Sequence, residues 1–399
     1  MARREGGILA TLCMVTHPKS CRCFGLASNR GVPGSCRAMN RPFHDRAKPV
    51  IESKNHYPFI TRLLIELFTS GSLPNVASVE IEPVYGYAGR IVYRDGSVRL
   101  FRGTSMGMNR LGASEVARDK GYTKFLLEQL GFQTPRGQVF LFPRFVRLID
   151  TNLGRFGFKE YAGTERILEY LEQAPGYPCY LKPNEGSQGR GIERCDTSAE
   201  VIEALERFDS AGASKVLVEQ AVSFPDYRVV VLGDEVISCY LRKPLCLMGD
   251  GVSTIEELLM QRQRQFVAEG RDTIINLKDS RIDKGLFQQG WTRDTVLPSD
   301  HSWQVYQVSN LSVGGDSEDF TDRIHPHWRR LCIEVTAAMG LRFCGVDLAC
   351  EDICRGDSAY SILEINAAPG LDNYAATGPK QASLVRDLYQ RVFNESIDA

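Results

Sequence analysis

The sequence feature that most limits the fold is a glycine-rich loop enclosed by two strand patterns. The segment YLKPNEGSQGRGI (180–192) has glycines at 186, 189 and 191, and the apolar pattern PCYLKP leads into it. The two common phosphate loops, G-x-x-x-x-G-K-[ST] and G-x-G-x-x-G, each open a helix. Here the order is G-x-x-G-x-G, and the following IERCD favours a short strand. The loop is therefore predicted to join two antiparallel strands, which argues against both motifs.

A hairpin of this kind suits a flap that closes over phosphate groups. Successive backbone N–H groups can bind an anion without a helix dipole, and glycine allows both close approach and positive φ. Lys182 ends the preceding strand and is placed to contact a phosphate oxygen. The alternative for the loop is an ordinary hairpin turn with solvated Ser, Gln and Arg side chains.

Helix and strand patterns alternate through most of the chain. Apolar spacing predicts helices over 57–74 and 113–132, and the Asp-Gly pair in YRDGSV predicts a hairpin turn. The segment YRVVVLGDEVISCYLRKP (227–244) reads as two strands around a Gly-Asp turn, and FCGVDLACED and AYSILEINAAP read as two more strands. This order favours α+β lobes over a doubly wound sheet.

Charge and cysteine content exclude several functional classes. The 48 Lys and Arg residues and 49 Asp and Glu residues give a net charge of −1, so neither nucleic acid nor membrane is an expected partner. The apolar stretch at 6–15 is too short for a membrane span and lacks a cleavage pattern. Twelve cysteines without a paired C-x-x-C pattern indicate reduced thiols and a cytoplasmic protein.

Residues 1–48 differ from the rest of the chain. They contain nine Lys or Arg residues against two acidic ones, with no helical or strand period. We expect a basic, disordered tail, with a targeting segment as the alternative.

Carboxylates lie inside two apolar strand patterns near the C-terminus. Asp347 lies in GVDLA, and Glu364 and Asn366 lie two residues apart in LEINAAPG. Residues two apart on a strand point to the same face, so neighbouring strands can present all three to one point. Oxygen ligands without His or Cys suit Mg²⁺ or Mn²⁺. The alternative is a set of polar residues on the wet face of a half-exposed sheet.

A third group of residues surrounds the strand KVLVEQAV. Backbone groups of Glu219 to Val222 could meet an adenine edge, and Asp226 could accept hydrogen bonds from ribose hydroxyls. Arg228, Arg242 and Lys243 add positive charge nearby. Each of these charged residues taken alone is better explained as a surface charge.

Taken in order, these motifs resemble the ATP-grasp ligases. The resemblance rests on RDKGYTKFLLEQLGFQTPRG, on Lys182 with EGSQGRGI, on VLVEQAVSFPDYRVVVL, on GVDLA and on LEINAAPG. It is closest to the ATP-grasp part of cyanophycin synthetase and of glutathione synthetase and RimK-like ligases. GDGVSTIEELL, QQGWTRDTVLP and NLSVGGDSEDFTDRIHP are similar to the same subgroup. It covers roughly residues 110 to 395.

The resemblance implies an ATP-grasp fold, in which two α+β lobes clamp ATP behind a smaller N-terminal α/β domain. The expected divisions are a tail at 1–48, an N-terminal domain at 49–118, a lobe with the flap at 119–222, and a lobe with the metal site at 223–399.

The resemblance also implies roles for individual residues. ATP would be bound by Lys120, Lys182, Gly186, Ser187, Gly189, Gly191, Glu219, Gln220, Ala221, Val222 and Asp226. The metal ligands would be Asp347, Glu364 and Asn366. The catalytic residues would be Arg242 and Lys182. The substrate would meet Arg228, Asn310 and Gly370.

The implied reaction is phosphorylation of a carboxylate to an acyl phosphate, which a small-molecule amine then attacks. One alternative is modification of a protein or of a ribosomal peptide, and another is a non-catalytic ATP-binding module. The chain stops soon after LEINAAPG, so one ligase centre is expected. Asp372 and Asn373 stand where the subgroup tends to have basic residues, which argues against an aspartate-rich polymer as substrate. A homodimer is left open.

Overall fold

The computed structural model describes most of the chain after residue 53, and residues 50–399 group as one unit. The described residues are 54, 56–153, 158–184, 191–269, 271, 273–307, 309, 311 and 314–396. The predicted tail at 1–48, the flap residues Gly186, Ser187 and Gly189, and the substrate residue Asn310 lie outside these ranges. The domain boundaries predicted above therefore stay a prediction.

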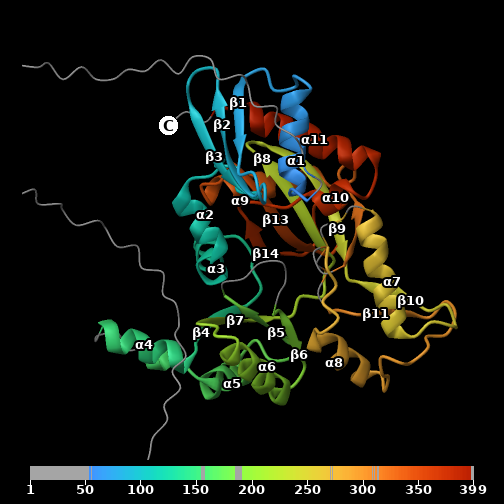
Figure 1. Ribbon diagram of the computed structural model, residues 1–399. Coiled ribbons are helices and arrows are strands. Elements are labelled where there is room, and N and C mark those ends of the chain that lie inside the picture. The colour runs from blue at the N-terminus through green and yellow to red at the C-terminus, as the bar shows by residue number, and fades with distance from the viewer. Residues whose placement is uncertain are drawn as a thin grey trace, which may run out of the picture. The chain divides into compact units, whose positions relative to one another are not determined.

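The first described elements form a small sheet with a helix on it (Figure 1). Helix α1 (Phe59–Thr69) precedes the antiparallel strands β1 (Val76–Ile81), β2 (Ala88–Tyr93) and β3 (Val98–Arg102). Their apolar side chains share one core with the last helix, α11 (Pro379–Asn394). The predicted helix and the hairpin turn at Asp95 and Gly96 are confirmed.

A four-stranded antiparallel sheet carries the glycine-loop hairpin. Its order is β4 (Gly137–Leu141), β7 (Lys215–Gln220), β5 (Cys179–Pro183) and β6 (Glu193–Cys195). Helices α5 (Thr164–Gln173) and α6 (Ser198–Ser210) share its apolar core, while α4 (Pro143–Leu153) and a short 3-10 helix (Phe158–Tyr161) follow β4. Because β5 and β6 pair antiparallel, the predicted hairpin around the glycine loop is confirmed.

A five-stranded antiparallel sheet carries the predicted carboxylates. Its order is β12 (Asp316–Asp319), β9 (Glu235–Lys243), β8 (Asp226–Leu232), β13 (Phe343–Cys350) and β14 (Tyr360–Asn366). Helix α9 (Pro326–Ala338) packs against β8, β9 and β13 through a core that includes the fully buried Trp328. The two strands predicted at 227–244 are confirmed, with Gly233 in their turn.

The single helix predicted over 113–132 is wrong. The structure has two helices, α2 (Leu111–Arg118) and α3 (Lys120–Gln129), separated at Asp119. Asp119 has extended backbone (φ −92, ψ 108), and its carboxylate accepts a 2.9 Å hydrogen bond from the Tyr122 N–H. An aspartate that caps a new helix competes with continuation of the old one. The break places Lys120 in the first turn of α3.

An insertion between β9 and β12 forms a subdomain with its own core. It contains β10 (Cys246–Met248), α7 (Ile255–Ala268), α8 (Ser280–Gln288) and β11 (Ser302–Gln304), and β10 pairs with β11. Thr254 and Glu257 form a reciprocal capping box at the start of α7. A short helix, α10 (Asp372–Ala375), follows β14.

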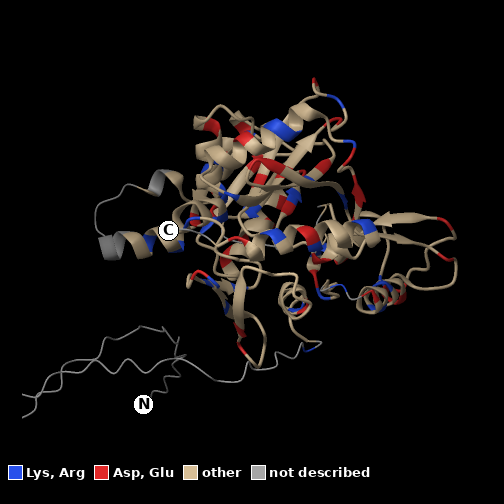
Figure 2. Ribbon diagram, turned by 90° about the horizontal axis from the view of Figure 1, so that it is seen from above, with Lys and Arg blue, Asp and Glu red and all other residues tan. Residues whose placement is uncertain are grey.

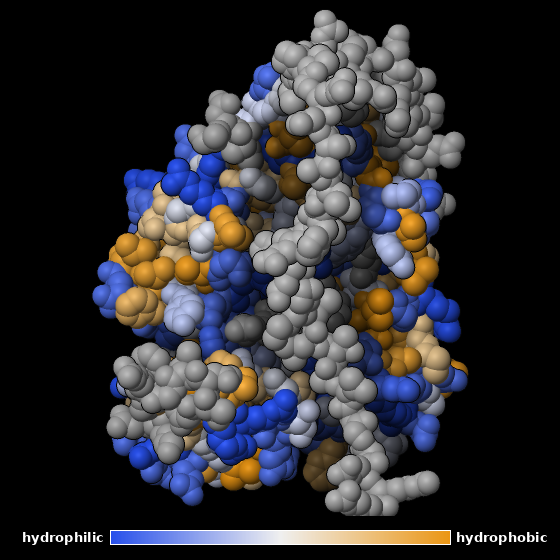
Figure 3. Space-filling view, turned by 60° about the vertical axis from the view of Figure 1, so that its left-hand side comes forward, coloured by the Kyte–Doolittle hydropathy of each residue, from blue (hydrophilic) through white to orange (hydrophobic). Residues whose placement is uncertain are grey.

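The described surface mixes polar and apolar side chains. On the face drawn in Figure 3, hydrophobic residues lie scattered among hydrophilic ones where the structure is described. No helix among the described residues is long and apolar enough to cross a bilayer.

Candidate functional site

Lys120 reaches the carboxylate of Glu364 from the start of α3. The Lys120 Nζ lies 3.4 Å from Glu364 Oε1, and the Lys120 side chain is 8% exposed. The next residue, Gly121, donates its N–H to Asn184 Oδ1 at 2.9 Å. Asn184 is the last described residue before the glycine loop. The structure therefore brings the first predicted phosphate lysine, a predicted metal ligand and the base of the loop together.

Lys182 forms a buried ion pair with Glu219. Its Nζ lies 2.6 Å from Glu219 Oε2, and the Glu219 side chain is only 2% exposed. Burial alone would lower the pKa of Lys182, but the Glu219 carboxylate outweighs it and raises that pKa. Lys124, one turn after Lys120, lies 3.9 Å from the same carboxylate. Lys182 therefore stays charged beside a buried glutamate.

Backbone N–H groups of the predicted adenine segment are partly engaged within the protein. The Gln220 N–H donates to the Arg136 carbonyl at 2.8 Å, and the Ala221 N–H donates to the Pro178 carbonyl at 3.2 Å. An adenine bound here would therefore have to form hydrogen bonds with the carbonyl oxygens of this segment or with the backbone of Val222.

A narrow pocket lies beside Glu219, with apolar walls from α3 and β14. Its lining includes Lys120, Lys124, Glu219 and Glu364. The volume is about 10 Å³, which is roughly the space that one water molecule needs. An aromatic ring could enter this pocket only if the lining side chains moved apart.

Two aspartates and two arginines form a charged cluster on the five-stranded sheet. Arg242 Nη2 donates to both carboxylate oxygens of Asp226 at 2.7 Å and lies 2.8 Å from Asp347 Oδ2. Arg228 binds Asp347 through two nitrogens, with Nη2 3.1 Å from Oδ2. Asp226 and Arg242 are thus partners here, although the sequence assigned one to ribose and the other to the transferred phosphoryl group.

The two aspartates of the cluster differ in pKa. Burial opposes ionisation of Asp347, but Arg228 and Arg242 outweigh it and hold its pKa below the usual range. Burial raises the pKa of Asp226, and one arginine partner does not compensate for burial and the neighbouring Asp347 charge. Asp347 is therefore the more firmly ionised of the pair.

Strand register places the three predicted metal ligands on one side of β13 and β14. Asp347 lies directly opposite Glu364, and Gly345 lies directly opposite Asn366. A Cβ atom at Gly345 would meet the Arg228 Cδ at 2.7 Å, so only glycine leaves room for Arg228 to cross to Asp347. The two carboxylates thus lie on neighbouring strands, and their convergence on a metal ion stays a prediction.

These residues offer a donor set that fits a hard divalent cation. Two carboxylates and an amide supply oxygen ligands, which Mg²⁺ prefers. The Asn366 Nδ2 is buried with no hydrogen-bond partner in the described part of the chain. Among the described residues, no three His, Cys, Asp or Glu side chains gather closely enough to hold an ion without further ligands.

The remaining predicted residues lie at the borders of the site. Gly191 is the first described residue after the loop and has φ +74, a value that favours glycine. Gly370 is exposed and follows β14, and a Cβ atom there would lie 3.3 Å from Asp372 Oδ1.

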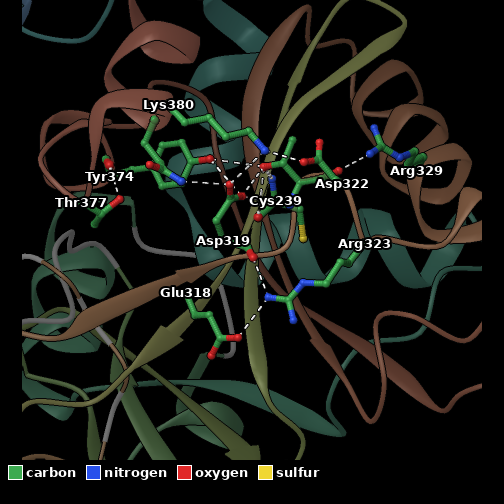
Figure 4. Close-up of polar contacts among 11 residues, drawn as sticks. Cys239, Glu318, Asp319, Asp322, Arg323, Arg329, Tyr374, Thr377 and Lys380 are labelled. Carbon is green, nitrogen blue, oxygen red and sulfur yellow. Dashed lines mark hydrogen bonds and ion pairs between the residues drawn. The ribbon is translucent and has the colours of Figure 1, made fainter.

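Sequence reasoning missed a polar network beside the charged cluster. Tyr374 of α10 stacks on Tyr240 of β9 with ring centroids 4.5 Å apart. Its hydroxyl donates to Asp319 at 3.1 Å, and Gln381 donates to the same carboxylate at 3.0 Å. Figure 4 shows Tyr374 and Lys380 pointing toward Asp319. Nothing in the local sequence pairs these positions, because they come from three separate segments.

Acidic and basic residues are interspersed through the described structure (Figure 2). Within the site the four cations Lys120, Lys182, Arg228 and Arg242 face four carboxylates, those of Glu219, Asp226, Asp347 and Glu364. The formal charges of these eight side chains cancel.

Known proteins similar to this chain are consistent with the predicted resemblance. Residues 306–383 match the model of the RimK-like ATP-grasp domain. A cyanophycin synthetase of Geminocystis herdmanii is 31% identical over 271 residues, which cover 66% of this chain and 28% of that protein. The glutathione biosynthesis bifunctional protein GshAB of Mannheimia succiniciproducens is 29% identical over 269 residues, covering 64% of this chain and 32% of that protein.

A solved structure supports the fold. The bifunctional glutathione synthetase from Pasteurella multocida matches with a TM-score of 0.51 and 22% identity, over 84% of this chain and 45% of that one. The α+β fold class and the resemblance to ATP-grasp ligases are thus confirmed. The chain spans only about a third of the length of the two relatives above.

Proposed function

Because the chain contains a RimK-like ATP-grasp domain, we propose that it is an ATP-dependent ligase that joins a carboxylate to an amine and releases ADP. The carboxylate is first phosphorylated by ATP, and the amine then displaces phosphate from the acyl phosphate. A free carboxylate is a poor acyl donor because its leaving group would be oxide, and phosphorylation supplies a good leaving group.

The observation that carries the proposal is a set of paired charges on α3, on the five-stranded sheet, and on β5 and β7 of the four-stranded sheet. Each of the four cations lies within ion-pair distance of one of the four carboxylates, and none of these side chains is more than 26% exposed. ATP with two Mg²⁺ ions is also neutral overall. A neutral, preorganised site can exchange its internal ion pairs for pairs with phosphate oxygens and metal ions without a net charge imbalance.

Each member of the cluster has a chemical task in this proposal. Asp347, Glu364 and Asn366 would hold magnesium, which supplies neutralisation of phosphate charge when bound. Lys120 and Lys182 would exchange their carboxylate partners for phosphate oxygens. Lys120 contacts Asn184 through its backbone N–H, and Lys182 lies next to Pro183 at the end of β5. Both lysines therefore lie near the start of the glycine loop, which supports a shared phosphate site.

Arg242 is the residue that we assign to the transferred phosphoryl group. Its Nε is buried with no hydrogen-bond partner among the described residues. Burial of an unpaired guanidinium N–H is costly unless a ligand accepts from it. An oxygen of the phosphoryl group would satisfy this donor and, in a water-poor site, gain most as charge develops in the transition state.

The proposal is tested by ADP release from the purified full-length chain with ATP and Mg²⁺. Substrates are the twenty amino acids and a set of dipeptides, and products are identified by mass spectrometry. Arg242→Ala should reduce ADP release by about 100-fold, whereas Arg264→Ala, on the exposed side of α7, should leave it unchanged. ATP binding without ADP release in every mixture would contradict a ligase, and equal activity of Arg242→Ala would contradict this site.

A further inference from the structure

A second cavity lies outside the charged cluster, between the four-stranded sheet and the inserted subdomain. Its volume is about 340 Å³, within the range of small-ligand pockets, roughly 300 to 1,000 Å³. Among the described residues it is bordered by β6, α8 and β11. Arg281 of α8 donates to the Ile192 carbonyl at 3.4 Å and Lys284 lies 3.0 Å from Glu200. These contacts join α8 to the start of β6 and to α6.

The cavity runs along the edges of two strands. Consecutive residues 192–194 line it on one side, and all of β11, residues 302–304, lines it on the other. Successive side chains on a strand point to opposite faces, so a cavity over one face would be lined by every second residue only. Because neighbouring residues of both strands line it, the cavity must lie beside the strand edges.

Both of these edges lack a neighbouring strand. β6 is the last strand of the four-stranded sheet, and β11 is the outer strand of the two-stranded sheet. The outer edge of a strand presents backbone N–H and C=O groups that can pair with another chain. Two such edges facing one cavity make a place where an added strand could pair on both sides.

The side chains of the cavity favour a neutral polar ligand over a free ion. Its cations already have partners, since Arg281 lies 2.6 Å from Asp279 and Arg194 lies 2.8 Å from Asp196. The remaining wall is aromatic and amide in character, from Trp291, Trp303, Tyr306 and four glutamines. Aromatic faces and amides of this kind suit peptide groups and the side chains that alternate along an extended chain.

We propose that this cavity binds an extended peptide segment, which pairs as an added strand with the edges of β6 and β11. Main-chain hydrogen bonds would provide the affinity, and the aromatic and glutamine walls would select alternate side chains.

The cavity also has a short connection to the charged cluster. Gln307 lies at the cavity, and its carbonyl accepts a 3.2 Å hydrogen bond from the Tyr180 hydroxyl. Tyr180 is half-buried on β5, and the charges of Lys182 and Asp226 both act on its hydroxyl. One end of a peptide held in the cavity would thus lie near Lys182 and Asp226, which are proposed to bind ATP. Peptide binding in the cavity does not depend on the proposed function, but the assignment of the peptide as the ligase substrate rests on it.

Tryptophan fluorescence can detect binding independently of ligase activity. The chain has three tryptophans; two line the cavity, and Trp328 is buried in the core of the five-stranded sheet. The probes are pentapeptides with acetyl and amide caps, alanine at four positions and each amino acid in turn at the centre. We expect a saturable change with some of them without ATP, and none with the corresponding capped single amino acids.

Two comparisons test whether the cavity and its strand edges cause the signal. Gln288→Phe places a ring at the cavity lining and should weaken binding at least tenfold, whereas Gln261→Phe, exposed on α7, should change it less than twofold. Methylation of alternate backbone nitrogens in the tightest peptide should abolish binding, because it removes donors from one edge.

The outcomes separate this inference from the ligase proposal. The cavity assignment would be overturned if no pentapeptide changed the fluorescence. It would also be overturned if the methylated peptide bound as tightly as the unmodified one, or if the Gln288→Phe variant bound peptide as tightly as the unmodified protein. Each result would count even if free amino acids support ADP release. Peptide binding that meets both comparisons, together with absence of ADP release from any substrate, would retain the cavity and reject the ligase.

Discussion

The sharpest test of the site is a single added methyl group at Gly345. A Cβ atom there would lie 2.7 Å from the Arg228 Cδ and 3.2 Å from the Pro369 Cβ. Ordinary contacts between carbon atoms begin near about 3.5 Å, so Arg228 or β13 must move by about 0.8 Å. Arg228 cannot simply swing away, because its guanidinium is held on Asp347 by two nitrogens.

Gly345→Ala should therefore displace the Arg228–Asp347 pair without emptying the site. A shift of about 1 Å in a catalytic group can cost about 100-fold in rate, and overpacking of this kind costs about 1–3 kcal/mol of stability. We expect kcat for ADP release to fall about 100-fold, with a modest fall in Tm measured by circular dichroism. The ATP affinity, measured by calorimetry, should change far less than kcat.

The matched control is Gly112→Ala in α2, where a Cβ atom would meet no atom within 4 Å. Replacing an exposed helical glycine by alanine should stabilise the protein by about 0.5–1 kcal/mol and leave kcat unchanged. The reasoning fails if Gly345→Ala keeps activity within twofold of the unmodified protein. It also fails if the lost activity merely follows the fraction of unfolded protein at the assay temperature.

Three further predictions address the ion pairs and a turn. Glu364→Gln should lower turnover by about 100-fold while changing ATP affinity little, and equal rates across a Mg²⁺ titration would exclude Glu364 as a ligand. Lys182→Met leaves Glu219, 2% exposed, with Lys124 at 3.9 Å as its remaining cation, so unfolding free energy in urea should fall by about 3 kcal/mol. The double variant with Glu219→Gln should regain stability but not ATP binding; loss of both would point to a packing effect. Hydrogen bonds from Ser253 and Val252 lower the pKa of Asp250 to about 2, so its stabilising effect is full above its ordinary pKa of 3.8 and disappears as pH falls toward 2. Asp250→Ala should accordingly lower Tm at pH 6 but not at pH 2, and a constant Tm difference would contradict the hydrogen-bond explanation.

The parts of the site that depend on local pattern could be predicted from the sequence. The apolar runs around Asp347 and Glu364 identified two neighbouring strands, and the register of those strands follows once they pair. The glycine loop was recognisable as a hairpin because the residues after it, through Cys195, favour a strand and not a helix. In each case the signal lies within a few residues of the feature that it predicts.

The parts that depend on distant contacts could not be predicted. The partner of Asp226 is Arg242, and the partner of Lys182 is Glu219; each pair joins separate strands across a sheet. The helix break at Asp119 was missed for a different reason. Helical spacing continues across it, and the competing cap at Asp119 is stabilised in part by Lys215, which lies 3.1 Å away on β7. Tertiary context therefore decides between one helix and two.

The stack of Tyr374 on Tyr240 limits how residues 371–375 can be exchanged in engineered variants of this protein. These residues follow β14, and residues 372–375 form the short helix α10. In the structure, Tyr374 is anchored by β9 through its ring and by Asp319 through its hydroxyl. Transplanting the segment from a relative would leave Tyr240 unstacked and Asp319 short of a donor. A stable chimera would therefore have to exchange Tyr240, Asp319 and Tyr374 together.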